Sequence, residues 1–274
     1  MRVLRVSHSA VVDAWRERER EVRRRGASVR LLCARRWDEG GAPVELRPRP
    51  GEDVLGVRTW GTHPALFVYD PVPLWRALGQ RWDVIDIHEE PFALATAEVL
   101  LLRALRGNRA PYTLYSAQNI DKRYPPPFRW LERWALRRAS AVVVCNEAAG
   151  RIVQRKGFPG VADVLPLGVD PVQFAPSGAS RETERIVRVG YVGRLAEHKG
   201  VQVLLDAVAA SPDLRLTLAG AGPMESVCRA RAGVPPLAGR VEVLGKVSQV
   251  DLPAVFRSVD VLAVPSLTTP GWVE

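Results

Sequence analysis

The residues best suited to chemistry lie in one stretch, 190–200, which reads GYVGRLAEHKG. A predicted strand runs into Gly193, where the absence of a side chain lets a ligand approach the backbone closely. Arg194 follows at the strand end, and Lys199 stands where the next helix is predicted to begin. Two cations and helix N-terminal amides together can bind a diphosphate. On spacing alone, a turn with two solvated basic side chains is the competing interpretation.

The elements that must position these residues alternate between strand and helix along the whole chain. Apolar runs of the length of buried parallel strands lie at 3–6, 28–33, 83–87, 112–115, 141–144, 186–192, 215–219, 241–244 and 261–264. Segments of helical composition lie at 12–25, 93–105, 128–138, 200–210, 225–232 and 249–257. This alternation predicts doubly wound α/β folding, with ligands at the carboxyl ends of the strands.

The order of elements predicts two Rossmann-like domains of the α/β class. We assign residues 1–172 to an N-terminal domain, 173–184 to a linker and 185–274 to a C-terminal domain. The linker is poor in large apolar groups and rich in Pro, Ser and Gly. The second domain has four predicted strands where six would be usual, so we expect it to be incomplete and the chain to be truncated.

Composition limits the classes of partner. The chain has 274 residues, a net charge of +9 and a pI near 10.1. That charge favours anionic partners, but no helix-turn-helix or RNA-binding signature accompanies it, so we expect no nucleic acid. The charged segment 15–25 reads as a surface helix, with docking onto a membrane surface as the alternative.

The cysteine spacing and the hydropathy of the sequence indicate the cellular compartment of the protein. Three cysteines lie far apart without the spacing of a metal site, which is typical of a reducing cytoplasm. The sequence has no apolar run near the ~20 residues that cross a bilayer and no secretory signal. We therefore expect a cytoplasmic protein, with peripheral contact at the inner face of the membrane as the open alternative.

Five segments of the sequence resemble motifs of a known protein family. The stretch GYVGRLAEHKG resembles the donor-binding loop of family 4 glycosyltransferases, which have the two-domain GT-B fold. Four further segments resemble motifs of that family in the same order: DVIDIHEEP at 83–91, LPLGVD at 165–170, LAGAGP at 218–223 and DVLAVPS at 260–266.

The resemblance implies roles for individual residues. Gly193, Arg194 and Lys199 would bind the donor diphosphate. The nucleotide base would lie near Lys246 and Val247. His88 would take a catalytic place in the cleft, although a hydrogen-bonded histidine at a strand end is an equally simple interpretation. Glu274 aligns with the first glutamate of the family's E-x(7)-E motif, which contacts the donor sugar, and it counts here as the second catalytic candidate.

The resemblance also implies the reaction. We expect a retaining glycosyltransferase that moves a sugar from a nucleotide diphosphate donor to an unidentified glycan, lipid or small-molecule acceptor. No cofactor and no metal are expected, since no Asp-x-Asp pair is placed to hold one. The alternative is an inactive fragment, or a non-catalytic protein that binds a nucleotide sugar or a membrane surface.

Overall fold

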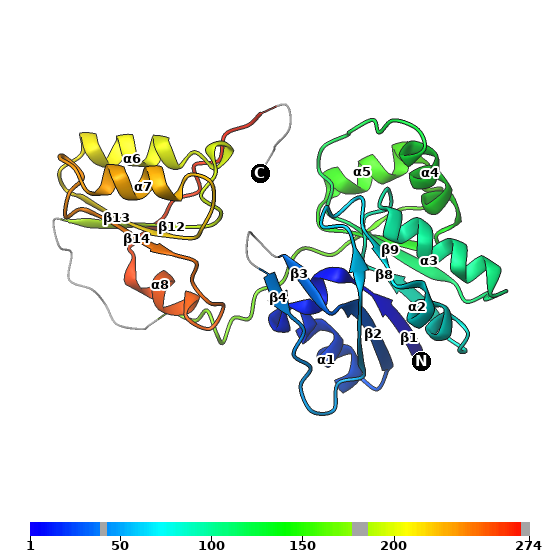
Figure 1. Cartoon of the computed structure of the whole chain (residues 1–274). Helices are drawn as coiled ribbons and strands as arrows, with labels where there is room; N and C mark the ends of the chain where they lie inside the picture. Colours follow the sequence, from blue (N-terminus) through cyan, green and yellow to red (C-terminus); the bar gives the residue numbers. More distant parts are fainter. Residues whose placement is uncertain (39–42, 177–185, 270–274) are drawn as a thin grey trace. The chain divides into compact units, whose positions relative to one another are not determined.

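The computed structural model describes residues 1–38, 43–176 and 186–269 (Figure 1). Contacts divide the chain into two units, Met1–Leu167 and Gly168–Glu274, called unit 1 and unit 2 below. Both units have the predicted α/β architecture built on parallel strands. Glu274 and residues 177–184 of the predicted linker lie outside the described residues.

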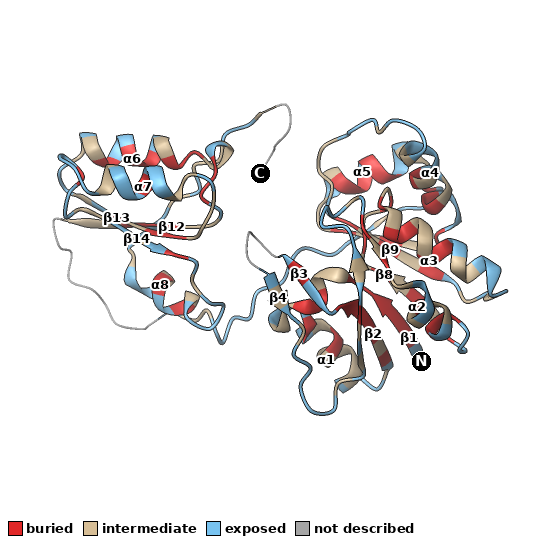
Figure 2. Ribbon diagram, in the orientation of Figure 1, coloured by how far each residue is buried: buried red, intermediate tan, exposed pale blue. Residues whose placement is uncertain are grey.

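Unit 1 is built on a seven-stranded parallel sheet with the strand order β11-β10-β9-β8-β1-β2-β5. Its strands are β1 (Arg2–Val6), β2 (Ser28–Ala34), β5 (Val54–Val57), β8 (Val84–Ile87), β9 (Tyr112–Ser116), β10 (Ala141–Val144) and β11 (Asp163–Val164). Two short antiparallel pairs flank it: β3 (Arg36–Asp38) with β4 (Pro43–Glu45), and β6 (Thr59–Trp60) with β7 (Val68–Tyr69). Figure 2 shows the buried residues gathered on the central strands β1 and β2.

The helices of unit 1 cover the two faces of this sheet unequally. They are α1 (Glu17–Arg24), α2 (Pro71–Leu78), α3 (Leu94–Leu105), α4 (Phe128–Arg138) and α5 (Glu147–Lys156). Helices α2 to α5 pack one against the next. The crossover from β1 to β2 runs in the opposite direction to those from β8 to β11. Because both are right-handed, α1 lies on the other face of the sheet.

The predicted single helix over residues 12–25 is wrong in its first half. Two short 3-10 helices, His8–Val11 and Asp13–Arg16, precede α1. The Arg16 side chain is buried and donates hydrogen bonds to the carbonyl oxygens of Ala10 and Val11, at 2.9 and 3.2 Å. These bonds fix the chain in tight turns, so regular helix begins only at Glu17. Gly26, at φ +89°, follows the helix end, where a left-handed residue is common.

Unit 2 has a four-stranded parallel sheet within its described residues, in the order β14-β13-β12-β15. The strands are β12 (Val187–Val192), β13 (Leu214–Ala219), β14 (Val241–Gly245) and β15 (Val261–Leu262), and the helices are α6 (Val201–Ala210), α7 (Glu225–Ala232) and α8 (Leu252–Ser258). Helices α6 and α7 cover one face of the sheet and α8 lies on the other (Figure 1). In the described parts of both units, no helix is both long and apolar enough to traverse a bilayer.

One carboxyl group in unit 1 makes the fold sensitive to pH. Glu98 of α3 accepts a hydrogen bond from the backbone N–H of Tyr69 at 2.8 Å, which ties α3 to β7. Burial, with a smaller contribution from the charge of Asp70, raises the pKa of Glu98 from 4.5 to about 7. Between those two pH values the unfolded chain releases a proton that the folded chain keeps, so the free energy of unfolding falls as pH rises through this window.

Replacing Glu98 by glutamine is expected to remove this decrease in the free energy of unfolding with pH. The amide oxygen of glutamine still accepts the hydrogen bond from Tyr69, and the amide does not ionise. Above pH 7 the variant should be more stable than the parent by about 1–2 kcal/mol, a figure discounted for partial exposure. Below pH 4.5 the two should be equal. Urea denaturation across this range measures the difference, and Glu147→Gln, an exposed glutamate of α5, is the control. A Glu98→Gln difference that does not change with pH would contradict the assignment.

Candidate functional site

The predicted diphosphate loop of unit 2 is held at the carboxyl end of β12. After this strand come Gly193 and Arg194, a short 3-10 turn at Glu197–Lys199, and then Gly200 and α6. Gly200 has φ +68°, and a Cβ at this position would lie 2.0 Å from the carbonyl oxygen of Pro265. Only glycine fits there, so the sequence sets the start of α6 against the loop after β15.

Backbone hydrogen bonds join the loops at this edge of the sheet. The N–H groups of Gly193 and Leu195 donate to the carbonyl oxygens of Ala219 and Ala221, each at 3.0 Å. The N–H of Gly220 donates to the carbonyl oxygen of Gly245 at 2.7 Å. The loops after β12, β13 and β14 therefore form one connected rim, which brings the predicted Lys246 and Val247 to the same edge as Gly193.

The electrostatics of the rim suit an anionic ligand. Arg194 is exposed, and no carboxylate within the described ranges forms an ion pair with it. Lys199 is half-buried one residue before Gly200, and Lys246 is exposed. Gly200 caps α6 and has no side chain, so the cap residue itself does not occupy the first N–H groups of this helix. A guanidinium and free helix N–H groups are the donors that bind phosphate oxygens.

The predicted catalytic histidine belongs to unit 1. His88 follows β8, and its Nδ1 lies 2.6 Å from Nη2 of Arg5 and 3.4 Å from Nη1 of Arg18. Its ring stacks on Tyr115 of β9, with centroids 4.0 Å apart and planes inclined by 9°. Arg5 is buried and also pairs with Asp86 and Glu19, each at 2.5 Å.

This environment fixes the protonation of His88. Burial above all, and then the charges of Arg5, Arg18 and His8, lower the pKa of His88 from 6.5 to about 2. A guanidinium can only donate hydrogen bonds, so Nδ1 must be the accepting nitrogen and Nε2 must carry the proton. At neutral pH His88 can thus donate a hydrogen bond from Nε2, but it is not poised to act as a base.

Sequence reasoning missed the two arginines around His88. Arg5 lies inside a strand that reads as apolar, and Arg18 lies in a segment that reads as a charged surface helix. The one available signal was the arginine at position 5 itself, because a charged residue in the middle of a buried parallel strand requires a partner. Of the predicted site residues, Glu274 lies outside the described part of the chain.

Both units match models of known protein families. The model described as Glycosyltransferase Family 4 matches residues 16–173, and the model described as Glycosyl transferases group 1 matches residues 186–272. The 2-deoxystreptamine glucosyltransferase of Streptomyces kanamyceticus is 28% identical over 219 residues, which are 69% of this chain and 56% of that protein. The D-inositol 3-phosphate glycosyltransferase of Mycobacterium marinum is 32% identical over 158 residues, 52% of this chain and 33% of that protein. The matched region thus spans about half or less of these relatives.

Solved structures share the fold at low sequence identity. Sucrose-phosphate synthase from Thermosynechococcus elongatus superposes with a TM-score of 0.69 at 16% identity, covering 98% of this chain and 76% of that one. Anabaena Alr3699/HepE in complex with UDP-glucose has a TM-score of 0.63 at 15% identity, with coverages of 97% and 74%.

Proposed function

Because this chain belongs to glycosyltransferase family 4 and has the GT-B fold, we propose that it transfers a sugar from a nucleotide diphosphate donor to a hydroxylated acceptor. The observation that carries the proposal is the connected rim of unit 2. There the exposed Arg194, the neighbouring Lys199 and the N-terminus of α6 offer positive charge and N–H donors at the carboxyl edge of a parallel sheet.

In this proposal the rim acts on the leaving group. When the bond between the sugar and the diphosphate breaks, negative charge grows on the phosphate oxygens. Donors that are already in place stabilise this charge without reorganising, which lowers the barrier to transfer. Arg194 and Lys199 supply that charge, so the proposal includes no metal and no cofactor. Lys246 and Val247 lie beside the base, and Glu274 contacts the donor sugar, as the family resemblance implies.

The stereochemistry and the acceptor are further parts of the proposal. Retention at the anomeric carbon follows from the family resemblance and from no residue pair of this chain. For the acceptor we propose a small cyclitol, since the names of two relatives carry 2-deoxystreptamine and D-inositol 3-phosphate. The solved complex of the Anabaena protein with UDP-glucose supports a nucleotide sugar as the donor class.

We also propose a cytoplasmic location, supported by the free thiols of Cys33, Cys145 and Cys228. Membrane contact through α1 is not part of this proposal. Arg20 pairs with Asp13, Glu17 and Glu52, and Arg24 pairs with Glu17 and Glu21. These two arginines of α1 are thus already paired with carboxylates of the same unit, which leaves them less available to anionic lipid.

Replacing Arg194 by alanine is expected to weaken the binding of a nucleoside diphosphate by about tenfold or more, because it removes a hydrogen-bonding cation worth roughly 1.5–3 kcal/mol. Lys199→Ala should act in the same direction. Isothermal titration calorimetry of the 274-residue chain with UDP, GDP and ADP measures the effect.

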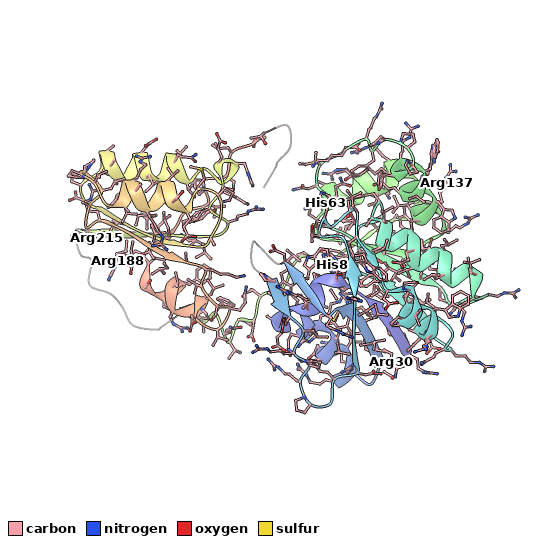
Figure 3. All side chains as sticks on the ribbon, viewed as in Figure 1. His8, Arg30, His63, Arg137, Arg188 and Arg215 are labelled. Carbon is pink, nitrogen blue, oxygen red and sulfur yellow. The ribbon has the colours of Figure 1, made fainter. Side chains whose placement is uncertain are left out.

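The matched control is Arg215→Ala. This arginine is exposed near the amino end of β13, at the edge opposite the rim, and donates to the carbonyl oxygen of Gly239 (Figure 3). Its loss should leave nucleotide affinity unchanged. Equal affinity of the parent and Arg194→Ala for all three nucleotides would reject the proposed role of the rim.

A further inference from the structure

A buried tyrosine of unit 2 supports the loop that carries Arg194. Tyr191 belongs to β12, is 3% exposed and packs in the apolar core of this unit. Its hydroxyl donates a hydrogen bond to the backbone carbonyl oxygen of Arg194 at 2.8 Å. A phenylalanine would fill the same space in the core without a polar atom to satisfy. The hydroxyl therefore links the core to the loop, a contact that apolar packing alone does not require.

The sequence leaves room for this contact at Gly193. A Cβ at this position would lie 3.0 Å from the hydroxyl oxygen of Tyr191 and 3.3 Å from the ring carbon that bears the hydroxyl. Both distances are shorter than an ordinary van der Waals contact, so a larger residue would push the hydroxyl and the loop apart. The tyrosine, the glycine and the arginine of residues 191–194 thus depend on one another.

The peptide group between Arg194 and Leu195 is held at both of its polar atoms. The carbonyl oxygen of Arg194 accepts from the hydroxyl of Tyr191 and from the N–H of Ala196, the latter at 3.0 Å. The N–H of Leu195 donates to the carbonyl oxygen of Ala221, and the Leu195 side chain is fully buried. These bonds turn the carbonyl of Arg194 toward Tyr191, while Arg194 itself is exposed. Of the three bonds, the one from Tyr191 comes from a side chain, so it can be removed without altering the backbone.

We propose that Tyr191 is a positioning residue of the donor site, whose hydroxyl holds Arg194 where its guanidinium meets the diphosphate of the nucleotide. This inference rests on the function proposed above and deepens it. Donors that are already in place bind a ligand more tightly, because a loop that must be ordered on binding costs part of the affinity. A group that touches no ligand can therefore control affinity by fixing the residue that does. Tyr191 acts in this way through the backbone of Arg194.

Replacing Tyr191 by phenylalanine removes the hydroxyl and keeps the ring. The variant should bind UDP about threefold to tenfold more weakly, which corresponds to the loss of one neutral hydrogen bond. Isothermal titration calorimetry measures the affinity, and thermal denaturation followed by circular dichroism measures the stability. The matched control is Tyr112→Phe in unit 1, because Tyr112 is 4% exposed and its hydroxyl donates to the backbone carbonyl oxygen of Ala135 at 2.7 Å. This control loses the same kind of bond and should bind UDP as the parent does.

A double-mutant cycle shows whether the hydroxyl acts through Arg194. Arg194→Ala keeps the carbonyl oxygen and removes only the guanidinium. Independent losses of affinity multiply, whereas losses from two groups that serve one contact do not. In a protein that already carries Arg194→Ala, the further change Tyr191→Phe should therefore weaken UDP binding by less than about twofold.

Two results would overturn the inference. A purely structural hydroxyl would lower the thermal stability of Tyr191→Phe and leave the UDP affinity of the folded protein unchanged. A hydroxyl that acts on the site by another route would weaken UDP binding by the same factor with and without Arg194. Equal UDP affinity of Arg194→Ala and the parent would instead contradict the proposed donor site itself, and this inference with it.

Discussion

Replacing Arg5 by methionine is expected to lower the free energy of unfolding of unit 1 by about 3–5 kcal/mol, since a buried charge loses its partner. Arg5 is 6% exposed, and its three nitrogens each face a different polar group: Glu19 at 2.5 Å, Asp86 at 2.5 Å and His88 at 2.6 Å. Methionine is as long and unbranched as the aliphatic stem of arginine. The variant therefore keeps most of the packing and leaves the buried Glu19 without a countercharge.

Tryptophan fluorescence during urea denaturation measures the unfolding of unit 1, because seven of the eight tryptophans lie in Met1–Leu167. The control is Arg30→Met (Figure 3), which breaks an ion pair of 3.0 Å with Asp53 whose side chains are 34% and 51% exposed. Exposed pairs contribute about 0–1 kcal/mol. The double variant Arg5→Met/Glu19→Met should recover part of the loss, since it removes both charges. If Arg5→Met costs no more than Arg30→Met, the buried ion pair does not stabilise unit 1 as described.

The fold of both units follows the sequence closely where apolar runs and glycines mark the elements. Helices α4 and α7 have the predicted bounds, and β1, β8 and β12 differ from prediction by one residue at most. The segment from residue 35 to 80 was not predicted. Helix α2 does carry a start signal that was missed, since Asp70 caps it and Pro71 is its first residue. The strands β6 and β7 carry none, because they have two residues each. Strands of that length carry no periodicity. Their pairing depends on contacts such as Glu98 with Tyr69, which join residues distant in the chain.

The two candidate sites differ in how far the sequence could predict them. The first loop of the rim of unit 2 consists of consecutive residues, since Gly193, Arg194 and Lys199 lie between β12 and α6. The surroundings of His88 combine residues from β1, α1 and β9. Each of those has an ordinary local interpretation, and only the register that places Arg5 beside Asp86 brings them together. The contact between His8 and Glu89 likewise joins residues 81 positions apart, so no local pattern in the sequence predicts it.

Replacing Gly220 by alanine is expected to disrupt the rim of unit 2 and weaken UDP binding by well over tenfold. A Cβ at Gly220 would lie 1.8 Å from the carbonyl oxygen of Gly193 and 2.8 Å from its carbonyl carbon. Both atoms belong to the backbone, so the loop that carries Arg194 must move away. That movement lengthens the hydrogen bonds from Gly193 to Ala219 and from Gly220 to Gly245. Overpacking of this kind costs about 1–3 kcal/mol in stability, and displacement of the diphosphate donors adds a separate loss in affinity.

Calorimetry with UDP measures the affinity, and hydrogen exchange at the amides of Gly193 and Leu195 reports the loss of the rim. The control is Gly233→Ala at the end of α7, where φ is −85° and the nearest atom to an added Cβ, the carbonyl oxygen of Ala230, lies 3.6 Å away. That distance is an ordinary contact, so this variant should bind UDP as the parent does and be slightly more stable. Because the two changes add the same methyl group to the same unit, their difference isolates the rim geometry. A Gly220→Ala protein with parental UDP affinity despite unprotected amides would show that nucleotide binding does not depend on the packing of these loops.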